Sequence, residues 1–289
     1  MAQKIVDYKC SNANAVGISE AISTALNLQF PQCYYDADTI VAMSLAVKEA
    51  EGSLFCRLPF CHTVEAEGLG GMINLNDIKY GPRASGYAYH SLRELTDLPP
   101  LALNQGRAGE ILKACRKLNN QGERVEFEVS GFLTILSSLI DLTVVFKAWR
   151  KDPEIIDQIF EFLSDNIYRF IVEAKNNGAA VVSYADPAGG VKITGPKYAE
   201  AIAVKHTLPL LRRINALADE NFILHLCPKT SWILTSLNLA EKSILDLGNR
   251  ISYEEATLKA LGKGKIIGQA CLKNASIMLN HGKLFCFEI

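Results

Sequence analysis

The 289-residue sequence has no long apolar run and no excess of charge of either sign. Its 30 Lys and Arg residues nearly balance 31 Asp and Glu residues, and the formal net charge is −1. A nucleic-acid backbone or an anionic membrane surface requires clustered basic residues, so we expect neither as a partner. The most apolar stretch, 135–148, is interrupted by serines and charged residues and falls short of the ~20 apolar residues of a membrane span.

The N-terminus also lacks the apolar core of a signal peptide, because Lys4, Asp7 and Lys9 follow one another closely. We therefore expect a cytoplasmic protein. Eight cysteines are spread thinly along a chain too large to need disulfides, and a reducing compartment keeps such cysteines as thiols. Most of them should be small buried side chains, and their spacing decides which are candidate metal ligands.

Repeats, low-complexity tracts and linkers are absent as well, so we expect a single domain over residues 1–289. Short apolar runs typical of strands alternate with amphipathic stretches typical of helices. The expected strands are Lys4–Tyr8, Leu54–Leu58, Glu126–Ser130, Ala179–Tyr184, Asn221–Cys227, Ser243–Leu247, Lys265–Gln269 and Lys283–Phe287. The expected helices are Thr39–Glu51, Gly109–Asn119, Thr134–Trp149, Ile155–Asn176, Tyr198–Asp219, Trp232–Leu239 and Ser252–Leu261.

This alternation predicts right-handed βαβ units and a parallel sheet. About seven or eight such units favour a closed (β/α)8 TIM barrel within the α/β class. No G-x-G-x-x-G motif follows the first expected strand, which counts against an open dinucleotide-binding sheet.

The catalytic residues of a parallel barrel lie at the C-terminal ends of its strands, so polar residues that end an apolar run are the candidates. The first case is His225-Leu226-Cys227, in which residues i and i+2 of a strand point to the same side. One imidazole and one thiol suit Zn²⁺, which keeps an open position when three protein ligands hold it. The alternative is a buried histidine bonded to a backbone carbonyl beside an inert cysteine.

A third zinc ligand has two candidates near other strand ends. Cys271 follows the expected strand Lys265–Gln269, and Cys286 lies inside the terminal run Lys283–Phe287. We prefer Cys271 for its position after a strand and keep Cys286 as the alternative. For either cysteine, packing in the core is an equally good interpretation.

Two carboxylates also follow strands. Asp186 lies at the junction Ser183–Pro187, where a turn or helix-capping role is the alternative to a catalytic one. Glu65 lies in the segment Leu58–Glu67, where acidic residues are also typical of a helix start. The adjacent Cys61 and His62 are disfavoured as a second metal pair because neighbouring side chains diverge.

These segments, in this order, resemble the uroporphyrinogen decarboxylase superfamily. The resemblance is carried by Pro59–Glu67, Gly131–Thr134, Ala185–Pro187 with Thr194–Lys197, and His225–Cys227, and it extends from about Asp7 to about Asn280. Within the superfamily the sequence resembles the methylcobalamin:coenzyme M methyltransferase branch. The decarboxylases have an Arg-rich segment near the N-terminus, and residues 1–30 contain no Arg. The methyltransferases have His-x-Cys and a distant Cys as zinc ligands, which His225 and Cys227 match.

The resemblance implies a zinc-dependent methyltransferase. Such an enzyme moves a methyl group from the cobalt of a methylated corrinoid, held on a separate small protein, to a thiol such as coenzyme M. A thiol bound to zinc is deprotonated, which supplies the nucleophile. Asp186 and Glu65 are then the candidate catalytic residues, as groups that orient the substrate or the metal-bound histidine.

The sequence departs from the family pattern at both ends. It begins close to the first barrel strand, and it lacks the last helix and the Pro-Gly-Cys-Gly segment that supplies the family's third zinc ligand, so the expected barrel is slightly truncated. Pro228-Lys229 also follows the His-x-Cys motif where the family usually has Gly. Two alternatives therefore stay open: a decarboxylase-like, metal-free tetrapyrrole-binding protein, and a catalytically silent accessory subunit of a corrinoid methyl-transfer system. A missing helix exposes an apolar flank, which a second copy or a partner subunit would cover.

Overall fold

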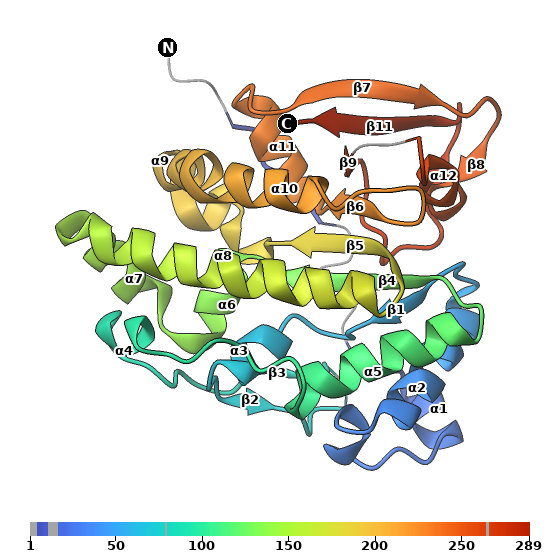
Figure 1. Ribbon diagram of the computed structural model, residues 1–289, viewed down its shortest axis with the longest axis horizontal. Helices are drawn as coiled ribbons and strands as arrows, with labels where there is room; N and C mark the ends of the chain where they lie inside the picture. The colour runs from blue at the N-terminus through green and yellow to red at the C-terminus, as the bar shows by residue number, and fades with distance from the viewer. Residues whose placement is uncertain (1–4, 11–16, 79, 264–265) are drawn as a thin grey trace.

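A seven-stranded sheet forms the centre of the computed structural model, which describes residues 5–10, 17–78, 80–263 and 266–289 (Figure 1). The strand order is β1-β4-β5-β6-β9-β11-β7. These strands are β1 (Cys56–Leu58), β4 (Val125–Ser130), β5 (Ala179–Ala185), β6 (Ile223–Leu226), β7 (Glu241–Asp246), β9 (Ile266–Ile267) and β11 (Lys283–Glu288). Short two-residue strands complete the count: β2 (Ile73–Asn74), β3 (Arg83–Ala84), β8 (Ile251–Ser252) and β10 (Met278–Leu279).

Neighbouring strands in the series β1, β4, β5, β6 and β9 pair in parallel, as the alternation of strands and helices predicts. The expectation of a wholly parallel sheet is wrong for β11, which lies antiparallel to both β9 and β7. The reason is the connection from β9 to β11, which contains no helix. A parallel pair needs a long crossover, whereas a chain that returns directly lies antiparallel. Among the described residues no ladder joins β7 to β1.

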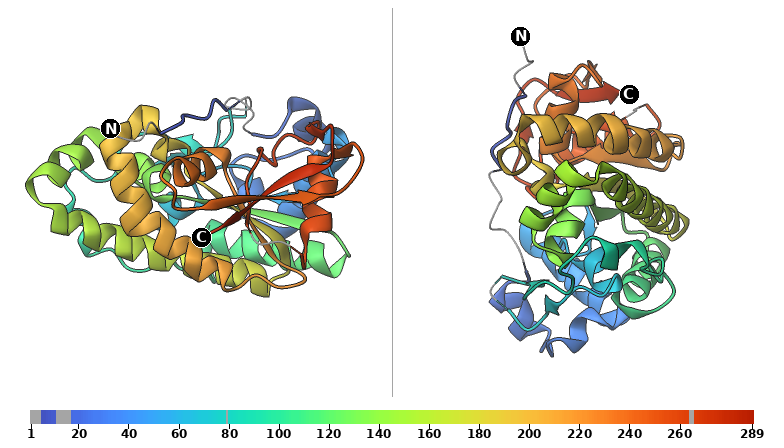
Figure 2. Two further views of the ribbon diagram at one scale, coloured as in Figure 1. Left: turned by 90° about the horizontal axis from the view of Figure 1, so that it is seen from above. Right: turned by 90° about the vertical axis from the view of Figure 1, so that its left-hand side faces the viewer.

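Helices cover one face of this sheet, where the larger apolar core lies. In Figures 1 and 2 the long helices α5, α8 and α10 lie side by side along it. The helices are α1 (Glu20–Ala25), α2 (Ala37–Glu51), α3 (Val64–Gly68), α4 (Arg93–Thr96), α5 (Gly106–Asn120), α6 (Phe132–Leu139), α7 (Leu142–Lys151), α8 (Pro153–Asn176), α9 (Val191–Ile202), α10 (Leu208–Asn215), α11 (Pro228–Ser236) and α12 (Tyr253–Ala260). Helix α8 begins with Asp152 as N-cap and Pro153 in its first turn.

The other face of the parallel strands packs on a second apolar cluster. Val181, Ile223 and Ile267 from three neighbouring strands meet Tyr253 and Ala256 of α12 there. This helix therefore covers the side of the sheet that carries the polar residues described below.

Three of the expected elements differ from the observed ones. The helix expected over Thr134–Trp149 is two helices, because Asp141 accepts a hydrogen bond from Thr143 N at 2.8 Å and starts α7. The helix expected over Tyr198–Asp219 is interrupted by a π-helical turn at Ala203–Thr207. Of the expected strand Lys4–Tyr8, residues 5–8 form no strand, and Lys4 lies outside the described residues. Lys265, the first residue of the expected strand Lys265–Gln269, also lies outside the described residues.

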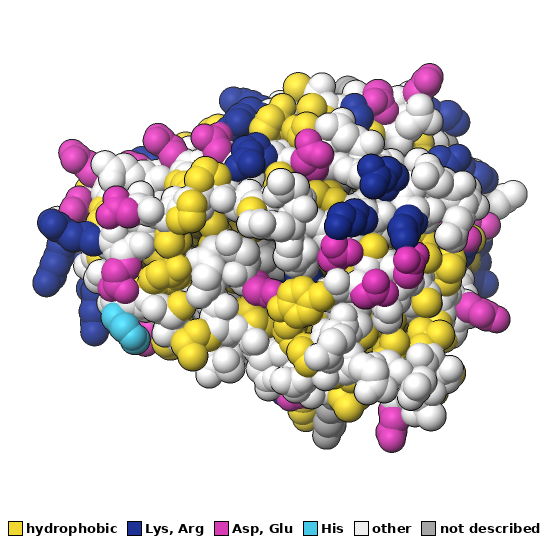
Figure 3. Space-filling model, turned by 60° about the horizontal axis from the view of Figure 1, so that its bottom comes forward, with side chains coloured by type: hydrophobic (Ala, Val, Ile, Leu, Met, Phe, Trp, Pro, Cys, Tyr) yellow, Lys and Arg dark blue, Asp and Glu magenta, His cyan; other side chains and the backbone are white. Residues whose placement is uncertain are grey.

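The surface shows no field of one sign on the face seen in Figure 3, where acidic and basic side chains are interspersed. Within the described chain no single helix is long and apolar enough to cross a membrane. The bent pair α6 and α7, with 112° between them, passes that test only when taken together.

Candidate active site

A row of polar side chains crosses the face of the sheet that α12 covers. The register pairs Glu128 of β4 with Ser183 of β5, and Ser183 with His225 of β6. Side chains on a strand alternate between faces, so these three lie on the side opposite the helical layer. Each of them is less than 8% exposed. Buried polar side chains need hydrogen-bond or ionic partners, so the contacts of each of these three residues have to be accounted for.

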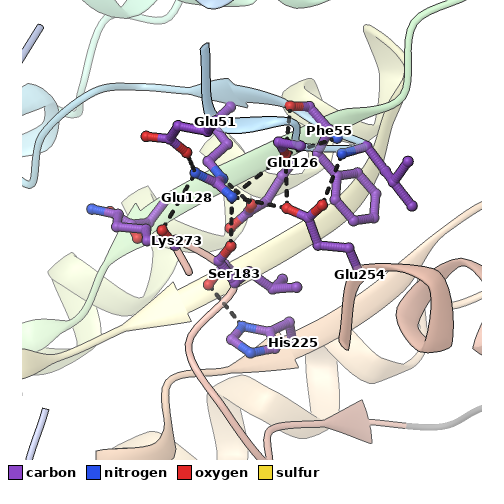
Figure 4. A network of polar contacts seen from close by, with 12 residues as sticks. Glu51, Phe55, Glu126, Glu128, Ser183, His225, Glu254 and Lys273 are labelled. Carbon is purple, nitrogen blue, oxygen red and sulfur yellow. Dashed lines mark hydrogen bonds and ion pairs between the residues drawn. The ribbon is translucent and has the colours of Figure 1, made fainter. Parts of the chain in front are cut away.

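His225 has partners on both sides of its ring, and Figure 4 shows the contact with Ser183. Its Nε2 lies 2.9 Å from the carbonyl oxygen of Ala270, and its Nδ1 lies 2.8 Å from Oγ of Ser183. A carbonyl oxygen only accepts, so Nε2 carries the proton and Nδ1 accepts from the Ser183 hydroxyl. Burial lowers the pKa of His225 to about 4, so the imidazole is neutral near pH 7.

Glu128 is at the centre of a second group of contacts. Lys273 Nζ lies 2.8 Å from Glu128 Oε1, and His62 Nδ1 lies 3.0 Å from the same oxygen. Burial alone would raise the pKa of Glu128, but His62 and Lys273 outweigh it and hold this pKa below its ordinary value. Burial also lowers the pKa of His62 to about 4. Near pH 7 the Glu128 carboxylate therefore lies between the Lys273 ammonium and the neutral imidazole of His62.

Arg57 of β1 is at the centre of a third set of contacts. It pairs in register with Glu126, which lies two residues before Glu128 on β4. Its guanidinium contacts Glu126 at 3.3 Å, Glu254 of α12 at 2.9 Å, and Glu51. It also donates to the carbonyl oxygen of Leu272 at 2.8 Å. Burial raises the pKa of Glu126 to about 7, against the lowering effect of Arg57. One guanidinium thus holds β1, β4, α12 and the segment after Cys271 together.

A cleft opens beside these clusters. Its volume is about 910 Å³, and it is lined by Arg57, Pro59, Phe60 and Lys273 together with residues of α1 and α2. Lys273 therefore joins the buried cluster around Glu128 to a space large enough for a small substrate.

The expected zinc ligands are brought to one region, but they do not form a finished site. Cys227 and Cys271 lie close enough for the charge of Cys271 to raise the pKa of Cys227. Burial is the main cause that raises the pKa of Cys227 to about 12 and that of Cys271 to about 11. Cys286 instead lies in the second apolar cluster, opposite Ile267 of β9.

The donor set fits zinc in kind. A ligating histidine usually donates one ring N–H to a carbonyl and binds metal through the other nitrogen, and the bond from His225 to Ala270 has this form. The remaining nitrogen is engaged by Ser183. Correspondingly, no three His, Cys, Asp or Glu side chains of the described residues converge on one metal position.

Asp186 directly follows β5, as expected, whereas Glu65 lies in the first turn of α3. Each carboxylate accepts hydrogen bonds from the backbone of another segment. Asp186 accepts from Thr134 N at 2.8 Å, from Thr134 Oγ1 at 2.7 Å and from Leu133 N at 3.2 Å, so it caps α6. Glu65 accepts from Ser130 N at 2.6 Å and from Ser130 Oγ at 2.9 Å. Burial raises the pKa of both carboxyl groups. The contacts of Asp186 match its capping alternative, and the position of Glu65 matches the alternative of a helix start. The proposed catalytic role of either residue stays a prediction.

Cys61 and His62 diverge, as expected for adjacent residues. Cys61 Sγ lies 3.1 Å from Nη1 of Arg107, whereas His62 faces Glu128. Sequence reasoning passed over the cluster of Glu128 and Lys273. The alternation Glu126-Phe127-Glu128 within an expected strand was the available signal, because it places two carboxylates on one face.

Comparison with known proteins identifies the family. A family model described as uroporphyrinogen decarboxylase (URO-D) matches residues 16–273. The chain belongs to this family. The resemblance drawn from the sequence motifs is therefore confirmed.

The curated relatives of this URO-D family member are methyltransferases. The methylcobamide:CoM methyltransferase MtbA of Methanosarcina acetivorans is 24% identical over 231 residues, which cover 79% of this chain and 68% of MtbA. The methylcobamide:CoM methyltransferase MtaA of Methanosarcina barkeri is 23% identical over 243 residues, 83% of this chain and 68% of MtaA.

A solved structure shares the fold. The structure of a methyltransferase from Methanosarcina mazei has a TM-score of 0.64 at 20% identity, and the match covers 80% of this chain and 68% of that one. Together with the family match, this likeness confirms the expected TIM-barrel fold, within which the antiparallel β11 is the departure described above.

Proposed function

We propose that this protein transfers a methyl group from a methylated corrinoid, carried on a separate protein, to a small thiol. The observation that carries the proposal is the similarity to two methylcobamide:CoM methyltransferases over about four-fifths of the chain, together with the His-x-Cys motif at the end of β6. The cleft lined by Arg57 and Lys273 supplies the space for a small acceptor. A small substrate in that cleft would lie next to Lys273, whose positive charge favours the anionic form of a thiol.

The reaction is a displacement at carbon. The sulfur atom of the acceptor forms a bond to the methyl carbon while the cobalt–carbon bond breaks, and the electron pair of that bond stays on cobalt. The proton of the thiol leaves to solvent through the open cleft. The protein contributes by holding the sulfur and the methyl group in line, which removes most of the entropy barrier of such an encounter.

We further propose that Zn²⁺ is held by His225, Cys227 and Cys271. Nδ1 of His225 would have to exchange the Ser183 hydroxyl for the metal, while Nε2 keeps its bond to Ala270. Zinc bound there would deprotonate the acceptor thiol. Asp186 and Glu65 are proposed to act by holding α6 and β4 in place around this region. Because the two cysteines need to stay reduced, we propose a cytoplasmic location.

An assay of the purified chain tests the proposed activity. Free methylcobalamin and a small thiol, such as coenzyme M or 2-mercaptoethanol, are incubated anaerobically with the protein, and the S-methyl product is measured by mass spectrometry. We expect product with the wild type and a loss of at least about a hundred-fold with Cys227→Ser. The matched control is Cys115→Ala, which removes a buried thiol on α5, outside the site.

The other functions predict different results. Binding of the corrinoid without turnover would point to the accessory subunit. Binding of a porphyrin carboxylate without any effect of methylcobalamin would point to the decarboxylase-like function. Either result would contradict the proposal.

A further inference from the structure

Strand β7 forms the outer edge of the seven-stranded sheet. In the described part of the chain it pairs with β11 alone, and five of its six residues are exposed. Figure 1 shows it along the top of the molecule, and the view from above in Figure 2 shows the β7–β11 pair in front. An exposed edge strand offers unpaired N–H and C=O groups to another strand.

The hydrogen-bond pattern shows which backbone groups these are. Leu247 N donates to Gly282 O at 2.9 Å, so residue 247 directs its backbone toward β11. Directions alternate along an antiparallel strand. Residues 241, 243 and 245 therefore also face β11, and Lys242, Ile244 and Asp246 direct their N–H and C=O groups to the open edge.

The side chains of these same three residues share one face of the strand. Ile244 is 54% exposed, the largest exposed fraction among the exposed large hydrophobic side chains of the described residues. Phe285 lies opposite Ile244 on β11, with Lys242 Nζ 4.4 Å from the centre of its ring. A small apolar patch thus lies between a positive and a negative side chain along the open edge.

A two-fold antiparallel pairing centred on Ile244 matches this arrangement. It sets Ile244 against the same residue of a second copy, and it sets Lys242 against Asp246 twice. It also joins only backbone groups that face the open edge. Centring the pairing on Lys242 or Asp246 would oppose like charges, and centring it on residue 243 or 245 would leave Lys242 and Asp246 unpaired with each other. The charges therefore select one register.

We propose that β7 pairs with β7 of a second copy of this chain in that register, so that the two sheets become continuous. The interface is isologous and closed, because each copy uses the same residues. A strand pair of this length buries less than the roughly 1,600 Å² of a standard interface, so we expect a dissociation constant in the micromolar range. Charged residues on an edge usually prevent association; here they prevent every register except one.

Sedimentation velocity of the full chain over roughly 1 to 100 μM tests the proposal. We expect a monomer–dimer equilibrium that Lys242→Glu weakens by about ten-fold or more, because the substitution sets a second carboxylate against Asp246 in both symmetric pairs. The double variant Lys242→Glu/Asp246→Lys restores opposite charges and should return the dissociation constant to within about three-fold of the wild type. Glu241→Lys is the control, since Glu241 points to the other face of β7. Circular dichroism verifies that each variant is folded.

Three results would overturn the proposal. The first is a monomer throughout the concentration range. The second is a dimer that Lys242→Glu leaves intact, which would locate the interface elsewhere. The third is a dimer that Lys242→Glu breaks and the double variant does not restore, which would exclude this register.

Discussion

Nε2 of His225 lies 2.9 Å from the carbonyl oxygen of Ala270, the residue directly before Cys271. This contact joins the His-x-Cys strand end of β6 to the loop after β9, although the two segments are 45 residues apart. It sets the tautomer of the imidazole and brings the loop of Cys271 next to the histidine. The same loop is held on its other side by the bond from Arg57 to Leu272.

The lone pair of His225 Nδ1 accepts a hydrogen bond from the Ser183 hydroxyl, so we expect Ser183 to weaken zinc binding at this nitrogen. Ser183→Ala removes the competing hydroxyl, so the variant should hold zinc about ten-fold more tightly than the wild type. Cys227→Ala and Cys271→Ala should each lower the zinc content of anaerobically purified protein well below that of the wild type. Metal analysis after dialysis against zinc buffers measures both effects.

The buried thiol of Cys286 provides the control for this series. Cys286→Ala should leave the zinc content unchanged, because Cys286 lies in the second apolar cluster, between the sheet and α12. Loss of zinc in this variant would make Cys286 the third ligand. An unchanged affinity in Ser183→Ala would show that His225 is not a ligand.

The carboxylate of Asp186 predicts separate effects on stability and on catalysis. Asp186→Ala leaves the amides of Leu133 and Thr134 without their acceptor and should lower the free energy of unfolding by roughly 2–4 kcal/mol. Asp186→Asn keeps one acceptor oxygen and should lose less than about 2 kcal/mol. Urea unfolding gives these values.

Activity of the folded Asp186→Asn variant then tests its role. A capping residue predicts methyl-transfer rates close to those of the wild type. A rate lowered a hundred-fold at nearly unchanged stability would instead assign Asp186 to the reaction itself.

Glu65 offers a more conservative test of the same kind. Glu65→Gln can still accept from Ser130 N through its oxygen, and its amide can donate to Ser130 Oγ. Burial raises the pKa of Glu65, so loss of its charge removes a buried anion. We expect the melting temperature of Glu65→Gln to stay within a few degrees of the wild type, and Glu65→Ala to lose about 2–3 kcal/mol. Equal destabilisation by both substitutions would contradict this account.

The strand order along the chain followed from local pattern, but contacts between strands did not. Runs such as Ala179–Tyr184 can be recognised in the sequence by their β-branched residues and flanking turns, and this run lies within the observed strand β5. The direction of β11 depends on the path of the chain after β9, which periodicity does not record. The break at Asp141 lies inside an apolar stretch, where a single capping carboxylate overrides helical periodicity.

The candidate site shows the same division. The motif His225-Leu226-Cys227 and the strand-end position of Cys271 can be read from the sequence, because spacing along one strand determines which side chains share a face. The pairing of Ser183 with His225 and of Glu128 with Lys273 depends on the register between strands. Residues this far apart in the chain meet only once the sheet is assembled.

The three carboxylates around Arg57 predict an unusual dependence of stability on pH. Burial raises the pKa of Glu126 from 4.5 to about 7, so the folded state retains a proton that the unfolded state releases at lower pH. The contribution of Glu126 to stability is therefore largest below about pH 4.5 and is lost as the pH rises through 7. Glu126→Gln keeps the neutral form at every pH. Relative to the wild type it should gain about 1–3 kcal/mol in the free energy of unfolding at pH 8, and close to nothing at pH 4.5.

Urea unfolding at the two pH values measures this difference, in which the contributions of buried histidines common to both proteins cancel. Glu51→Gln is the matched control, because Glu51 contacts the same guanidinium but is 45% exposed. It should change stability by less than about 1 kcal/mol at either pH. If Glu126→Gln were instead less stable than the wild type at pH 8, the attraction of Arg57 would exceed the effect of burial. Glu126 would then be ionised in the folded protein at neutral pH.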